Sequence, residues 1–82
     1  MNKELNKFLD IEVDTSTKEN LLRTIERLSN GNIECEELNF NMYDVIIYPK
    51  KNEVKLIFIV SDDENPIITI PLDKFYAEIE KW

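Results

Sequence analysis

Residues 43–60 read YDVIIYPKKNEVKLIFIV, and they predict a β-hairpin at the centre of the fold. The segments 43–48 and 54–60 are rich in β-branched and aromatic residues, which favour strands. Between them lies Pro49-Lys50-Lys51-Asn52. Proline presets the φ angle of a turn and asparagine tolerates a positive φ, so these four residues are expected to reverse the chain.

A third strand and a helix are expected after the hairpin. Residues 67–70 are apolar apart from one threonine and lie between Pro66 and Pro71. Proline cannot donate to a ladder, so proline at both ends is typical of an edge strand. Asp73 is expected to be the N-cap of a C-terminal helix. The apolar residues of that helix lie on or near one face: Leu72, Phe75, Tyr76, Ile79 and Trp82.

Two helices are expected before the hairpin. Apolar residues at spacing i, i+3, i+4 within the first nine residues predict a short amphipathic helix, followed by a connector over 10–14. A second helix is predicted at about 17–30, with Ser16 and Glu19 as a capping box and Gly31 ending it in the left-handed conformation. Residues 32–41 are expected to be extended and in part a strand.

These elements predict one α+β domain over residues 1–82. It has N-terminal helices, a three-stranded antiparallel β-meander and a C-terminal helix, because short connections favour antiparallel neighbours. The chain of 82 residues is 43% hydrophobic and 33% charged, a balance typical of a globular domain. Its single cysteine allows no internal disulfide, and neither a signal peptide nor a long apolar run is visible, which predicts a cytoplasmic protein.

The charge and the missing residue types exclude several function classes. The net charge is −7, from 17 acidic and 10 basic residues, which argues against direct binding to nucleic acid or to anionic lipid. The chain has no histidine and only one glycine, so a histidine-activated nucleophile and a glycine-rich phosphate loop are excluded. Residues 10–14 resemble the start of a calcium loop but lack its glycine. We therefore expect no enzyme activity, no cofactor and no metal.

Acidic side chains gather in three short segments. The clusters are Asp10/Glu12/Asp14, Glu34/Glu36/Glu37 and Asp62/Asp63/Glu64. Each cluster is either a solvated loop that aids solubility or part of an acidic surface for a basic partner. In the second case the carboxylates occupy positions that phosphates of a nucleic acid would take. Cys35 lies between two glutamates, a poor setting for a nucleophile, and is expected to be structural.

The predicted strands carry apolar residues on both faces. Ile46, Tyr48, Ile57 and Ile59 lie opposite the expected core face. Either helices or the N-terminal segment cover them, or they form an exposed patch that marks a partner or dimer surface. Tyr48 is then a candidate anchor, because aromatic residues are favoured in interface hot spots.

The stretch from Tyr43 to Trp82 resembles the second half of small bacterial immunity proteins. The similar features are the hairpin, the strand-to-helix junction over 68–75 and the aromatic residue that closes the chain. The size and acidity are also similar to those of phage anti-defence proteins, including anti-CRISPR inhibitors. The resemblance implies a protein that neutralises a nuclease, and it carries over no functional residues.

Two hypotheses follow from the sequence. The first is a small inhibitor whose acidic surface binds a basic, nucleic-acid-acting protein. Its candidate contact residues are Glu34, Glu36, Glu37, Asp62, Asp63, Glu64 and Tyr48. The second is an oligomeric structural or regulatory module, such as a homodimer, that assembles through the apolar sheet face.

Overall fold

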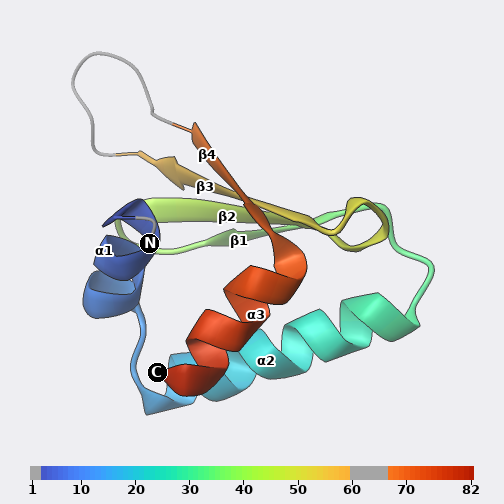
Figure 1. Cartoon of the computed structure of the whole chain (residues 1–82), viewed down its shortest axis with the longest axis horizontal. Coiled ribbons are helices and arrows are strands. Elements are labelled where there is room, and N and C mark those ends of the chain that lie inside the picture. Colours follow the sequence, from blue (N-terminus) through green and yellow to red (C-terminus); the bar gives the residue numbers. More distant parts are fainter. Residues whose placement is uncertain (1–2, 60–66) are drawn as a thin grey trace.

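In the described part of the chain, a four-stranded antiparallel sheet packs against a layer of three α-helices in the computed structural model (Figure 1). The structure describes residues 3–59 and 67–82. Their elements follow the order α1 (Lys3–Glu12), α2 (Thr15–Asn30), β1 (Glu36–Asn39), β2 (Tyr43–Tyr48), η1 (Pro49–Lys51), β3 (Glu53–Phe58), β4 (Ile67–Pro71) and α3 (Leu72–Lys81). The α+β class is confirmed. None of the described helices is long and apolar enough to cross a membrane.

The sheet has one strand more than the sequence predicts. Its order is β1-β2-β3-β4, and the added strand β1 pairs with β2 so that Leu38 lies opposite Val45. The sequence of β1, Glu-Glu-Leu-Asn, has little strand propensity, so its pattern does not reveal it. Pairing with the strong strand β2 and the inward-facing Leu38 stabilise β1 instead. The prediction of three strands was wrong in this detail, although an extended segment was expected there.

The predicted hairpin is confirmed. β2 and β3 pair from Tyr43 opposite Phe58 to Tyr48 opposite Glu53, and the short helix η1 joins them. Asn52 closes the turn in the left-handed region with φ of 54°, as expected for an asparagine in this place. Strand β3 ends at Phe58, earlier than the predicted 60, and Ile59 already lies in a turn. β4 is an edge strand, also as predicted.

The core lies between the helices and the inner face of the sheet, which is the face turned toward them. Phe8 of α1 is at its centre, with ring centroids 5.3 Å from Phe40, 5.6 Å from Tyr43 and 6.1 Å from Phe75. The first two contacts are edge-to-face, a favourable arrangement for aromatic rings. The buried hydrophobic residues are Leu5, Phe8, Leu9, Val13, Leu21, Ile25, Leu28, Tyr43, Val45, Ile47, Val54, Leu56, Ile70, Leu72, Phe75 and Ile79.

The first two helices differ from the prediction at their ends. α1 continues to Glu12, where a connector was expected, and the Glu12 carboxylate accepts a hydrogen bond from the Met42 N–H at 2.7 Å. α2 is capped by Asp14 rather than Ser16, because the Asp14 carboxylate accepts from the Thr17 N–H at 2.7 Å. Gly31 has φ of −100°, so the predicted left-handed stop was wrong and the chain leaves α2 in an extended conformation.

The start of α3 is held by the hairpin turn. Asp73 was predicted as the N-cap, but the helix already begins at Leu72, and Pro71 in the cap position makes no side-chain cap bond. Asn52 supplies the missing acceptors. Its backbone oxygen accepts from the Leu72 N–H at 2.9 Å, and its side-chain oxygen accepts from the Asp73 N–H at 3.1 Å. Asn52, which lies 21 positions before Asp73, therefore caps the start of α3, whereas the sequence predicted Asp73 itself as the cap.

Candidate protein-binding surface

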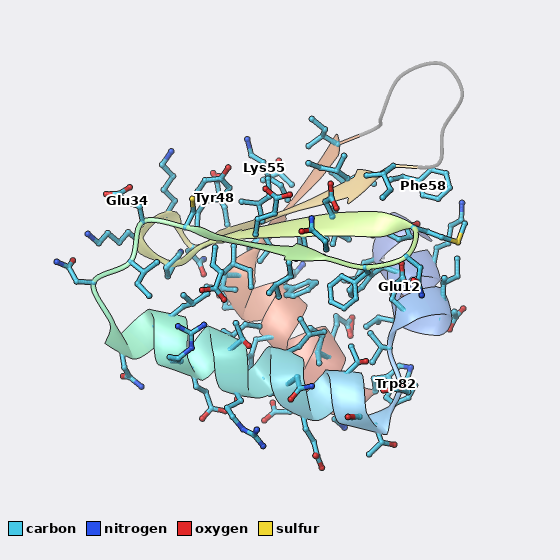
Figure 2. The ribbon with its side chains drawn as sticks, turned by 180° about the vertical axis from the view of Figure 1, so that it is seen from behind. Glu12, Glu34, Tyr48, Lys55, Phe58 and Trp82 are labelled. Carbon is cyan, nitrogen blue, oxygen red and sulfur yellow. The ribbon has the colours of Figure 1, made fainter. Side chains whose placement is uncertain are left out.

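The candidate site is the outer face of the sheet, which is the face turned away from the helices. The described helices α1, α2 and α3 lie on the other side, and none of them covers this face (Figures 1 and 2). The sequence left open whether this face is covered by helices or the N-terminal segment, or is exposed. The described residues fit the second alternative. Its side chains come from alternate positions of all four strands: Glu37, Asn39, Asp44, Ile46, Tyr48, Glu53, Lys55, Ile57, Ile67 and Thr69.

An apolar group lies on the outer face at the end of the sheet where β3 ends and β4 begins. Ile57 of β3 lies directly opposite Ile67 of β4, and Ile46 lies on the neighbouring strand β2. Ile46 and Ile57 are half-buried by their neighbours in the sheet, whereas Ile67 is 60% exposed and Ile59, just past β3, is 38% exposed. Large aliphatic side chains on an uncovered face are typical of a surface that another protein contacts.

Tyr48 lies on the outer face near the hairpin turn. The ammonium groups of Lys51 and Lys55 are 5.5 and 5.6 Å from its ring centroid, within cation–π range. Figure 2 shows Tyr48 and Lys55 on the side of the sheet away from the helices. Tyr48 therefore lies on this face as an aromatic side chain with two positive charges beside its ring.

Two carboxylates lie at the β1 side of the outer face. The Asn39 side-chain amide donates to Glu37 at 2.9 Å and to Asp44 at 2.8 Å, and thereby holds the two acids on neighbouring strands. Each carboxylate keeps further acceptor positions. This part of the face is therefore set up to accept hydrogen bonds or positive charge from a partner.

The predicted acidic cluster at residues 34–37 does not form one patch. Glu36 points toward the helix layer, where Arg27 donates to both its oxygens at 3.1 and 2.8 Å. Glu34 is 87% exposed and lies 3.9 Å from Lys50. Of Glu36 and Glu37, only Glu37 reaches the outer face, because neighbouring residues of a strand point to opposite sides. The other predicted cluster, Asp62, Asp63 and Glu64, lies outside the described residues.

Among the described residues, two groups have perturbed pKa values, and both lie in the helix layer, away from this face. The N–H of Thr17 holds the pKa of the Asp14 carboxyl below its usual value. A hydrogen bond of 3.0 Å from the Tyr76 hydroxyl to Glu26 raises the pKa of Tyr76. The first bond caps α2, and the second joins α3 to α2. Among the described residues no group of three or more acids and cysteines is arranged to hold a metal ion.

Several residues of the outer face were missed by reasoning from the sequence. Asn39, Asp44 and Lys55 were read only as polar positions in or near strands, and Ile67 only as part of an edge strand. Their common signal is period-two alternation across four paired strands, which needs β1 and the register to be known. No protein-family model matches this chain, and neither the curated proteins nor the solved structures provide a match.

Proposed function

We propose that this chain is a cytoplasmic, non-enzymatic inhibitor that binds a basic, nucleic-acid-acting protein through the outer face of its sheet. The observation that carries the proposal is the outer face that no described helix covers, where Asp44 lies opposite Ile57, Ile57 lies opposite Ile67, and Glu37 is linked to Asp44 through Asn39. The apolar group provides contact area, while the acidic groups toward β1 favour a partner of opposite charge and speed its approach.

The overall charge supports the same kind of partner. A net charge of −7 on 82 residues attracts a basic protein over a distance of about 10 Å at moderate ionic strength. A nucleic-acid-acting enzyme has the required basic surface, since it must contact phosphates. The inhibitor would occupy that surface with carboxylates.

The proposal is tested by capture from host lysate on the immobilised chain at low and high salt, with identification of the retained proteins. We expect one basic nuclease or nucleic-acid-binding enzyme, held less well at high salt. The variant Ile67→Asp should lose it, since the change places a charge in the apolar group. The matched control Ile11→Asp changes an isoleucine of α1 that is 43% exposed and should retain the partner. Equal retention by both variants would refute the outer-face proposal.

A second candidate function is self-assembly through the same face. The specific observation is that the face carries both signs of charge, with Glu37 and Asp44 toward β1 and Lys51 and Lys55 around Tyr48. Charges of both signs on one patch suit a twofold contact between identical surfaces. Sedimentation velocity over a concentration series distinguishes the two candidates, because a chain that stays monomeric when concentrated contradicts self-assembly.

A further inference from the structure

The edge of the sheet formed by β1 has backbone groups available for another strand. Among the described strands β1 pairs only with β2, on one side, as the strand order shows. The Phe40 N–H donates to the Tyr43 carbonyl at 2.8 Å, which fixes the alternation along this pair. The backbone groups of Glu36 and Leu38 then bond to β2. The backbone N–H and C=O groups of Glu37 and Asn39 point away from β2, toward the open edge of the sheet. An unpaired edge of this kind is a template for strand addition.

A groove lies beside this edge, between β1 and α2. Its volume is about 230 Å³, and its walls include Thr17, Asn20 and Thr24 of α2 and Leu38 and Phe40 on the sheet side. These α2 side chains are uncharged, and Leu38 and Phe40 are only partly buried. A strand added to β1 would direct every second side chain toward this groove, where an apolar side chain of moderate size would pack against Leu38.

The other side chains of an added strand would lie on the outer face, level with Glu37. Residues directly opposite each other on neighbouring strands have Cβ atoms about 5 Å apart. A lysine or arginine opposite Glu37 would therefore reach the Glu37 carboxylate. The Asp44 carboxylate of β2 lies nearby, because the Asn39 amide donates to both carboxylates. Glu36 does not take part, since it is already paired with Arg27.

We infer that β1 accepts an extended segment of the basic partner as a fifth strand, with basic residues facing outward and apolar residues facing the groove. The inference rests on the proposed function, because it takes the partner's charge from there. Affinity would come from main-chain hydrogen bonds and selectivity from the alternating side chains. A second copy of this chain is the competing occupant: self-pairing of β1 centred on residue 37 would oppose two Glu37 carboxylates, whereas pairing centred on residue 38 would place Glu37 opposite Asn39, and sedimentation velocity of the chain alone tests for it.

The opposite edge of the sheet is less suitable for the same segment. By the same alternation, the backbone groups of β4 that point away from β3 belong to Ile67, Thr69 and Pro71. Pro71 has no N–H to donate. The groove beside β4 is lined by Lys74, Glu78 and Lys81 of α3, and Glu78 lies 3.8 Å from Lys81, so the lining keeps one positive charge in excess, which disfavours a basic strand. The two edges therefore differ in both donors and charge, and β4 serves as an internal control.

The test uses the full chain labelled with ¹⁵N and an octapeptide that alternates lysine with valine, with both ends blocked. We expect shift changes along β1 and slower hydrogen exchange of the Glu37 and Asn39 amides. The same peptide with glutamate in place of lysine should give no such changes. Protection on β4, or equal effects of the two peptides, would overturn the inference.

Two variants and one control sharpen this test. Glu37→Pro removes an outward donor without touching the bonds to β2, and should weaken peptide binding about tenfold or more. Glu37→Lys keeps the backbone and should also weaken it. Thr69→Pro makes the equivalent change on β4 and should bind like the parent chain, provided that its spectrum shows a folded protein. Unchanged binding by both Glu37 variants would contradict strand addition at β1.

The same variants separate this inference from the proposed function. A natural partner lost by Ile67→Asp but retained by Glu37→Pro would leave the outer face as the contact and overturn strand addition. A partner retained by both variants would overturn both. A partner lost by both, with Thr69→Pro and Ile11→Asp unaffected, is the result that the two proposals together require.

Discussion

The two faces of the sheet are built from alternate residues of the same strands, yet only the inner face packs against the helices to form the hydrophobic core. On the inner face, Val45, Ile47, Val54 and Leu56 are almost completely inaccessible. On the outer face, the neighbouring residues Ile46 and Ile57 are half-buried by the sheet itself, and Ile67 is mostly exposed. The hydrophobic core therefore forms without the apolar residues of the outer face, which is the physical reason for proposing that they contact a partner.

The largest expected effect comes from comparing Leu56→Ala with Ile57→Ala, two adjacent residues of β3. Leu56 is 1% exposed, and its truncation should cost about 2–5 kcal/mol because it leaves a cavity in the core. Truncation of Ile57 should cost less than about 1.5 kcal/mol, since no described helix packs on it. Urea unfolding followed by circular dichroism measures both. Equal costs would mean that the outer face belongs to the core.

The next effect concerns the bond between the helix layer and the hairpin. Asn52→Ala removes the side-chain acceptor for the Asp73 N–H and places alanine at φ of 54°. The lost cap and the left-handed conformation together should cost about 2 kcal/mol. Asn52→Gly relieves the backbone and should recover part of the loss. If glycine is no better than alanine in thermal unfolding, backbone strain contributes nothing at this turn.

A smaller and pH-dependent effect is expected at the start of α2. The Thr17 N–H lowers the pKa of Asp14 in the folded state, so the carboxylate stabilises the fold above its unfolded pKa. This contribution is lost as the pH falls through the lower, folded pKa. Asp14→Ala should therefore destabilise the chain at neutral pH, and the difference from the parent should narrow in acid. A gap that stays constant down to strongly acidic pH would contradict the charged cap.

The smallest effect is expected for the ion pair between α2 and β1. Arg27→Ala removes both hydrogen bonds to Glu36, but the arginine side chain is 55% exposed, so the cost should be about 0–1 kcal/mol and should fall with added salt. Partner retention should not change, because Glu36 faces the helix layer. Loss of the partner in this variant, with stability intact, would return Glu36 to the binding surface.

The sequence predicts the parts of this fold that depend on local signals. The hairpin from Tyr43 to Phe58 follows from strand propensity and turn residues, and α2 follows from its apolar period. β1 was missed as a strand because its pairing with β2, rather than its composition, makes it one. The cap of α3 was misassigned because Asn52 reaches it from another part of the chain.

For the candidate site, too, the local patterns were predicted correctly and the features that depend on strand pairing were not. Tyr48 and the apolar side chains of β2 and β3 were identified from alternation alone, because both strands were known. The glutamates at 34, 36 and 37 looked like one acidic cluster, but strand geometry sends Glu36 and Glu37 to opposite faces. The link between Glu37 and Asp44 through Asn39 depends on the register of β1, which no local pattern contains.

The most direct measurement is an NMR footprint of the captured partner on the ¹⁵N-labelled chain. Binding to the outer face predicts that the amide signals of Asp44, Tyr48 and Ile57 change on addition of the purified partner, while those of exposed positions in α2 such as Arg23 stay in place. A footprint confined to α2 and α3, with the strands unaffected, would contradict the central claim that the uncovered face is the binding surface.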